Sequence, residues 1–202
     1  MIILDHEQGT EEWFASRRGK PSASMFSKLI TMTGKPSSSA VSYIDELVAE
    51  VITGETEHFS NSHTERGTLL EPEAREDYEF ITDNEVLECG FIVDPGFSYG
   101  CSPDGLVTEN GESVGGLEIK CPAAKTQASY LRDDSLAVKK YWCQIQGCMW
   151  LTDRAWWDLF TYHPKMPHVL VRVNRDNEFI EKMAVEVKAA AIAIKTQVEK
   201  EQ

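Results

Sequence analysis

The segment CSPDGLVTENGESVGGLEIKC, residues 101–121, decides the fold predicted for this chain. It contains two apolar runs joined by the turn sequence Glu109-Asn110-Gly111, a pattern typical of a β-hairpin. Residues two apart on a strand face the same side, so Glu118 and Lys120 are predicted to share one face. Asp104 lies on the neighbouring segment and is predicted to reach the same place. Charged side chains on a buried apolar strand lower the stability of the fold, so their presence indicates a functional role.

Two carboxylates and an ammonium predict a divalent metal site with a cationic helper. Oxygen ligands from Asp104 and Glu118, with a backbone carbonyl of the strand, suit Mg²⁺ or Mn²⁺. A pair of such ions activates water and stabilises the leaving oxygen in phosphodiester cleavage. Lys120 is then expected to orient the water or to stabilise the developing negative charge. A structural ion pair at the strand edge is the alternative, because E-x-K also occurs by chance.

Length and composition predict one soluble domain over residues 1–202. The chain is 42% hydrophobic and has no apolar run long enough for a membrane span, and its N-terminus lacks the features of a signal peptide. The five cysteines form no C-x-x-C pair, which favours reduced thiols and a cytoplasmic protein.

The net charge of −13 at first argues against a nucleic-acid partner. However, residues 44–112 carry 18 Asp/Glu and two Lys/Arg, whereas residues 113–202 carry 11 and 13. The acidity is therefore concentrated in the middle of the chain. A local basic groove for DNA stays compatible with this distribution.

Helices are predicted on both sides of the hairpin. Residues 10–18 form a helix capped by Thr10, and residues 42–54 form an amphipathic helix that ends at Gly54. Residues 64–80 and 135–152 are also helical, and two strands at 155–164 and 168–175 precede a long final helix. Residues 86–95 are predicted as one strand and residues 123–134 as a looser stretch. The order predicts an α/β or α+β domain with a central mixed sheet.

Some polar residues on these elements have two interpretations. A second helix is expected to begin at Ser22 or Ser24, shortly after Arg17. Arg17 and these serines either bind an anion together, or Arg17 only complements the end of its own helix while the serines cap the next one. Gln144 lies within an apolar helix face and is either functional or a satisfied core amide. Glu71 sits at the edge of an apolar stripe, and Lys35, in a Gly/Pro/Ser loop, is free to touch a charged partner.

Six separated motifs, in collinear order, resemble the phage lambda exonuclease family, also called YqaJ-type viral recombinases. They are SRRGKPSAS (16–24), SYIDELVAEVITG (42–54), RGTLLEPEA (66–74), CSPDGL (101–106), LEIKCP (117–122) and QIQGCMWLT (144–152). The resemblance implies a PD-(D/E)xK restriction-endonuclease-like core. It also implies Mg²⁺-dependent, processive 5′-to-3′ digestion of one strand of duplex DNA to mononucleotides, which leaves a 3′ single strand.

The resemblance assigns roles to individual residues of this chain. Asp104 and Glu118 resemble the metal ligands, assisted by the carbonyl of Ile119, and Lys120 the catalytic lysine. Glu71 is similar to an acidic helix residue at the site, and Gln144 to a glutamine that positions the catalytic centre. The residues that resemble the pocket for the 5′-terminal phosphate are Arg17, Ser24 and Ser102.

The resemblance also implies a ring-shaped homotrimer, a single-strand annealing protein as partner, and a phage or prophage origin within a bacterial cell. Two other functions use the same residues. One is a PD-(D/E)xK endonuclease, and the other is a non-catalytic module that binds DNA ends. An endonuclease would not depend on a pocket for the terminal phosphate, and the intact acid pair with Lys120 argues against the non-catalytic module.

Overall fold

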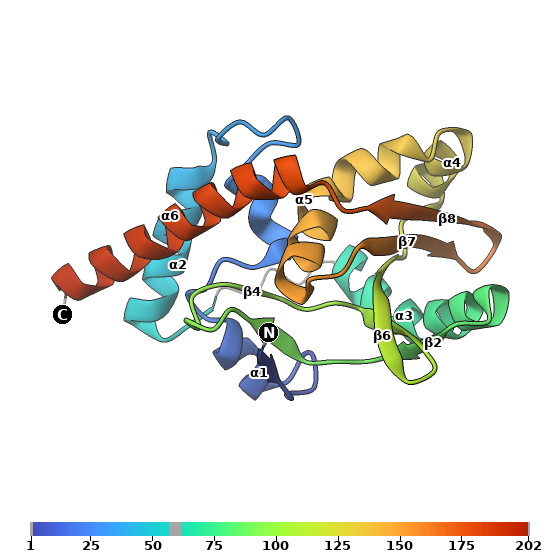
Figure 1. The fold of residues 1–202 in the computed structure, drawn as a ribbon, viewed down its shortest axis with the longest axis horizontal. Coiled ribbons are helices and arrows are strands. Elements are labelled where there is room, and N and C mark those ends of the chain that lie inside the picture. The colour runs from blue at the N-terminus through green and yellow to red at the C-terminus, as the bar shows by residue number, and fades with distance from the viewer. Residues whose placement is uncertain (1, 57–61, 202) are drawn as a thin grey trace.

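The computed structural model describes residues 2–56 and 62–201. In chain order the elements are β1 (Ile2–Leu4), α1 (Glu11–Arg17), the 3₁₀ helix η1 (Ala23–Lys28), α2 (Ala40–Thr53), α3 (Ser62–Thr82), β2 (Glu85–Leu87), β3 (Phe91–Val93), β4 (Gly100–Cys101), β5 (Gly105–Glu109), β6 (Glu112–Lys120), α4 (Ala124–Arg132), α5 (Ser135–Thr152), β7 (Trp156–His163), β8 (Met166–Asn174) and α6 (Asn177–Glu201). Figure 1 shows α6 running past α2 to a projecting C-terminal end, with α3 and α4 at the opposite end of the molecule.

Two sheets are present, and the larger one is mixed. Its strand order is β2-β5-β6-β7-β8, in which β6 and β7 are parallel and the other pairs are antiparallel. A smaller antiparallel sheet has the order β1-β3-β4. The predicted α/β class with a central mixed sheet flanked by helices is confirmed.

The parallel pair β6–β7 requires a crossover connection, because two parallel neighbours cannot be joined by a tight turn. Helices α4 and α5 supply it. The prediction of a looser stretch at 123–134 was wrong, since α4 occupies most of it. Its apolar pattern is weak: among its buried residues are the polar Gln127 and the partly polar Tyr130.

The two faces of β6 lie against different helices, as the two-residue period predicts. One face contributes Leu117 and Ile119 to a cluster with Ala74 and Tyr78 of α3. Glu118 is on the other face, toward α5, where its side chain is fully buried. The site is therefore enclosed between the sheet and α5 rather than open on a hairpin edge.

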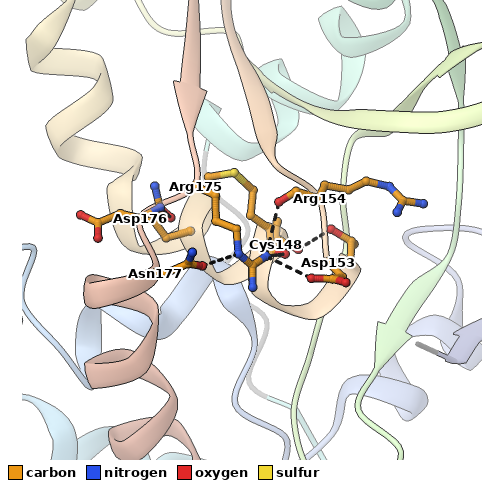
Figure 2. A network of polar contacts seen from close by, with 9 residues as sticks. Cys148, Asp153, Arg154, Arg175, Asp176 and Asn177 are labelled. Carbon is orange, nitrogen blue, oxygen red and sulfur yellow. Dashed lines mark hydrogen bonds and ion pairs between the residues drawn. The ribbon is translucent and has the colours of Figure 1, made fainter.

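The C-terminal end of α5 is fixed by Arg175, which follows β8 (Figure 2). Its guanidinium donates to the carbonyls of Met149 and Arg154 and to Asn177 Oδ1 at 2.8 Å. A cation at the carbonyl end of a helix matches the helix dipole, and here it adds to the backbone N–H groups of Asp153 and Arg154 that already bind the Met149 carbonyl. Because α5 also packs against η1 and both sheets, this contact helps to hold Gln144 in place.

Two local predictions differ from the structure. The single strand predicted at 86–95 is divided into β2 and β3, which belong to different sheets. Gly90 lies at the break, where a Cβ would be 2.0 Å from the Leu4 carbonyl oxygen of β1. The helix expected after Ser22 is a short 3₁₀ helix, and the Ser22 side chain forms no cap hydrogen bond. None of the helices within the described ranges combines the length and apolarity needed to cross a membrane.

Candidate active site

Asp104 and Glu118 are brought together by the register of the hairpin. Gly105 pairs with Leu117, so the residue before β5 lies beside the end of β6. Asp104 Oδ2 accepts a hydrogen bond of 2.7 Å from the Ile119 backbone N–H. The carboxylate of Asp104 is therefore held directly against the strand that carries Glu118.

Glu118 is the centre of the polar contacts. Its Oε1 accepts a hydrogen bond of 2.6 Å from Gln144 Nε2 and forms an ion pair with the Lys120 ammonium. Its Oε2 is buried and has no hydrogen-bond partner within the described part of the chain. A buried carboxylate oxygen without a donor is unfavourable in isolation, and a bound cation would satisfy it.

Burial and mutual repulsion raise the pKa values of these carboxyl groups. Burial, followed by the charge of Asp104, raises the pKa of Glu118 to about 8. Burial also raises the pKa of Asp104, although Lys120 opposes the shift. Burial alone would lower the pKa of Lys120, but the carboxylates of Glu118 and Asp104 outweigh it, and the net shift is upward. The lysine is therefore held as a cation.

Glu71 of α3 faces the same group. Its pKa is raised to about 7, first by burial and then by the charge of Asp104, while Arg75 and Lys120 oppose the shift. Arg75, one turn further along α3, binds Glu71 at 3.0 Å and Glu88 at 2.8 Å. Sequence reasoning aligned Arg75 with Glu71 on one helix face but did not assign it a part in the site.

A further aromatic residue lines the site from α5. The Lys120 ammonium lies 5.3 Å from the centre of the Tyr141 ring, and the Lys140 ammonium lies 5.2 Å from it. Sequence reasoning placed Tyr141 on an apolar helix face. Its spacing of three residues from Gln144 was the signal that both face the site.

Arg17 forms a separate group with serines from two segments. Its guanidinium donates to Ser102 Oγ at 2.7 Å and to Ser22 Oγ at 3.3 Å. The ring of Trp13 stacks 4.2 Å from the guanidinium carbon. Burial lowers the pKa of Arg17, partly opposed by Tyr43 and Cys101. Arg17 thus contacts two hydroxyl groups and has no ion-pair partner among residues 2–56 and 66–201.

Ser24 and Lys35, the other two residues predicted to contact DNA, form no direct hydrogen bond with Arg17 or with the carboxylates in the described part of the chain. Ser24 is exposed and meets Arg17 only through Ser22, whose Oγ is 3.2 Å from Ser24 Oγ. Ser22 is the serine that sequence reasoning missed as a contact. Lys35 is exposed in a turn closed by Thr31, and within the described ranges no hydrogen bond or ion pair joins it to the other site residues.

The donor set fits a hard cation with few protein ligands. In the described ranges, no group of three or more His, Cys, Asp or Glu side chains is arranged as a metal site. Two adjacent carboxylates and strand carbonyls remain as oxygen donors, and one of the carboxylate oxygens is buried without a partner. Magnesium sites commonly use one or two carboxylates and leave the remaining positions to water and substrate phosphate.

The sequence model of the YqaJ-like viral recombinase domain matches residues 12–155, which include every residue of this site. The chain belongs to the YqaJ-like viral recombinase domain family. The resemblance to this family inferred from the six motifs is thereby confirmed, and a search of curated proteins finds no match.

Solved structures extend the relationship of this YqaJ-like chain beyond residues 12–155. An alkaline exonuclease, LHK-Exo, from Laribacter hongkongensis is 34% identical, with 95% of each chain covered and a TM-score of 0.83. The same protein in complex with dAMP is 35% identical over the same coverage. A phage-related exonuclease from Haemophilus somnus 129PT shares the fold, with a TM-score of 0.76 and 18% identity over 91% of this chain and 96% of that chain. Family and relatives support a nuclease function of the exonuclease type.

Proposed function

We propose that this chain is a Mg²⁺-dependent exonuclease that digests one strand of duplex DNA in the 5′-to-3′ direction. One observation carries the proposal: the phosphate-binding candidate Ser102 and the metal-ligand candidate Asp104 are separated only by Pro103. Two residues span at most about 7 Å of chain. A strand rises about 3.4 Å per nucleotide. A 5′-phosphate on Arg17 and Ser102 would therefore place a phosphodiester one or two nucleotides away near Asp104.

Such a spacing favours release of short products, with mononucleotides as the proposed product. The complex of LHK-Exo with dAMP supports this part of the proposal, because dAMP is a nucleoside monophosphate. The strand that remains would carry a 3′ single-stranded tail. Tails of this kind are substrates for recombination by strand annealing.

Asp104, Glu118 and the carbonyl of Ile119 would hold the metal, with two Mg²⁺ ions as the proposed complement and Mn²⁺ as a substitute. Bound there, the ions would activate water and stabilise the leaving oxygen. Gln144 keeps Oε1 of Glu118 in place and leaves the buried Oε2 without a protein donor, so Oε2 is the oxygen that a cation would bind. Residues that orient metal ligands in this way commonly matter almost as much as the ligands.

Lys120 and Glu71 have different proposed roles in the reaction. Lys120 stays protonated and places its ammonium beside Glu118, where it would orient the water or stabilise the charge on the phosphate. Glu71, with its raised pKa, faces Asp104 and Lys120 and would take part in proton handling or water positioning. Arg75 keeps Glu71 within this group.

Arg17 would bind the 5′-terminal phosphate, with Ser102 and Ser22 in direct contact and Ser24 behind them. A half-buried guanidinium with no carboxylate partner in residues 2–56 and 66–201 is suited to an anionic ligand, because arginine presents several donors in one plane. Lys35 would act outside this pocket, on DNA further from the end.

The proposed assembly is a ring-shaped homotrimer, working in the cytoplasm of a bacterial cell on duplex ends and passing the 3′ tail to a single-strand annealing protein. Family membership and the uneven charge support this assembly. An acidic middle third that faces outward would leave the more basic segments for the DNA.

A linear duplex with a 5′-phosphate and one labelled strand tests the proposal. In Mg²⁺ the wild type should release labelled mononucleotides from the 5′ end, and Asp104→Asn and Lys120→Ala should release essentially none. Cleavage of closed circular duplex would identify an endonuclease instead. Binding of ends without release of nucleotides would identify a non-catalytic module.

A further inference from the structure

Lys140 is an exposed cation at the rim of the site that the proposed chemistry does not use. It precedes Tyr141 on α5 and lies one helical turn before Gln144, which binds Glu118. Its ammonium is 5.2 Å from the centre of the Tyr141 ring, and the Lys120 ammonium is 5.3 Å from the same centre. These two distances limit the separation of the ammonium groups to 10.5 Å.

The two lysines differ in what neutralises them. Lys120 is paired with the buried carboxylate of Glu118. Lys140 forms no ion pair with any carboxylate in residues 2–56 and 66–201, so its positive charge is not compensated by the protein. An anion placed near Lys140 would meet a cation that no carboxylate of these residues neutralises.

The local charge also differs from that of the rest of the chain. Residues 120–140 contain five Lys/Arg and two Asp/Glu, which leaves 15 Lys/Arg and 31 Asp/Glu elsewhere. This segment comprises the end of β6, all of α4 and the start of α5, and the two helices pack against each other. A basic surface of this kind beside a catalytic strand is suited to a polyphosphate ligand.

We propose that Lys140 binds a backbone phosphate of the DNA within about three nucleotides of the cleaved bond, given a rise of about 3.4 Å per nucleotide along a strand. This inference rests on the proposed nuclease function and adds a residue that holds the substrate. Both ammonium groups lie near the Tyr141 ring, so Lys140 would bind the backbone within 10.5 Å of Lys120. The contact carries no sequence information, because every nucleotide presents the same phosphate.

Lys139 provides a matched control. It has the same charge and is also exposed, but it lies one turn before Cys143, whose thiol donates to the Ile30 carbonyl in the core. On an α-helix, adjacent residues point about 100° apart, so Lys139 faces away from Gln144 and the site. A general loss of positive charge would affect both variants alike.

The test measures initial digestion rates of a 5′-phosphorylated duplex at several DNA and KCl concentrations. Lys140→Ala should raise KM several-fold, leave kcat within about two-fold of wild type, and reduce the slope of log kcat/KM against log salt by about one. Lys140→Arg should restore both values, and Lys139→Ala should leave the slope unchanged. Equal effects of the two alanine variants, or a fall in kcat alone for Lys140→Ala, would overturn the inference.

Binding separates this inference from the proposed function. Anisotropy of a fluorescein-labelled duplex in Ca²⁺ reports affinity without requiring release of nucleotides. If wild type binds the duplex but releases nothing, the proposed function fails, while the difference between Lys140→Ala and Lys139→Ala still tests the phosphate contact. If both variants bind with equal affinity and equal salt slope, the contact is absent whatever the activity.

Discussion

Gln144 Nε2 donates a hydrogen bond of 2.6 Å to Oε1 of Glu118, and this leaves Oε2 of the same carboxylate buried without a partner. The glutamine and the glutamate come from α5 and β6, so the contact joins the helix to the catalytic strand. It fixes which oxygen of Glu118 is left for a cation. The following predictions begin from this arrangement.

Gln144→Ala should raise the Mg²⁺ concentration needed for half-maximal activity by about 10- to 100-fold, because Glu118 would lose the group that orients it. A Mg²⁺ titration of the digestion rate measures this change. Gln146→Ala is the control: Gln146, on the same helix and fully buried, donates to the Asn174 carbonyl at 2.9 Å and accepts from the Asp176 N–H. That variant should lower thermal stability without changing the Mg²⁺ requirement, and a shift in Mg²⁺ requirement for Gln146→Ala alone would contradict the assignment.

Activity should rise with pH and level off above about 8, because the pKa values of Glu71 and Glu118 are raised to about 7 and 8, and the site requires ionised carboxylates. Initial rates from pH 6 to 9 at subsaturating Mg²⁺ test this dependence, because protons then compete with the metal for the carboxylates. No decline is expected at the alkaline end of this range, because the pKa of Lys120 is raised and its ammonium stays protonated. A rate that is flat from pH 6 to 9, under conditions where cleavage is rate-limiting, would contradict it.

Stability without metal should change in the opposite direction. A carboxyl group whose folded-state pKa lies above its ordinary value favours folding when protonated, and this contribution is lost as pH rises through the folded pKa. For Glu118, the loss occurs between its ordinary value of 4.5 and about 8. The melting temperature in EDTA should therefore fall from pH 5 to 9, and Glu118→Gln should reduce the fall. Identical pH profiles for Glu118→Gln and wild type would show that another group is responsible.

Arg17→Ala should slow digestion of ends that carry a 5′-phosphate by about ten-fold or more, because a charged hydrogen-bonding contact contributes about 1.5–3 kcal/mol. The same variant should have little effect on ends with a 5′-hydroxyl. Paired assays on the two substrates separate the phosphate contact from general damage, which would lower both rates. Arg17→Lys should recover only part of the loss, because lysine cannot bridge Ser102 and Ser22.

Asp158→Ala should destabilise the fold by about 1–3 kcal/mol, since it leaves the buried Tyr78 hydroxyl without its acceptor and removes the partner of the half-exposed Arg172 guanidinium. The Asp158 carboxylate accepts hydrogen bonds from Nε and Nη2 of Arg172, both at 2.9 Å, and from the Tyr78 hydroxyl at 2.8 Å. Chemical denaturation measures the loss. Asp153→Asn is the control, because the Asp153 carboxylate is 94% exposed and 3.7 Å from Arg175, and asparagine keeps the left-handed backbone of this position, so the change should cost less than about 1 kcal/mol. Equal losses in the two variants would refute the role of burial.

The hairpin site could be predicted from sequence because its signals are local. The two-residue period of β6 separates Glu118 from Leu117, and the helical spacing of α5 turns Gln144 toward the sheet. Arg17 and Ser102 are 85 residues apart, so their hydrogen bond depends on how α1 packs beside β3 and could not be predicted from the residues alone. Family resemblance supplied that pairing.

Other features depend on packing that leaves no periodic signal. Strands β2 and β3 separate at Gly90 because the Leu4 carbonyl of β1 approaches it, and a three-residue strand such as β1 has too few residues to show a pattern. Ser22 contacts Arg17 and Ser24 does not, because the short η1 presents the two serines differently. Nothing in a run of small polar residues distinguishes the two.

The hydrogen bond from the Ile119 N–H to Asp104 also gives this carboxylate a structural role, because it extends the pairing of β5 with β6 beyond Gly105 and Leu117. Selection for a folded hairpin would therefore preserve an acceptor at position 104 even in a descendant that had lost catalysis. Glu118 is different, because its buried Oε2 has no hydrogen-bond partner, and without a bound metal this lowers the stability of the fold. In a relative that had become a binding protein, we therefore expect Glu118 and Lys120 to be replaced. Asp104 would be retained.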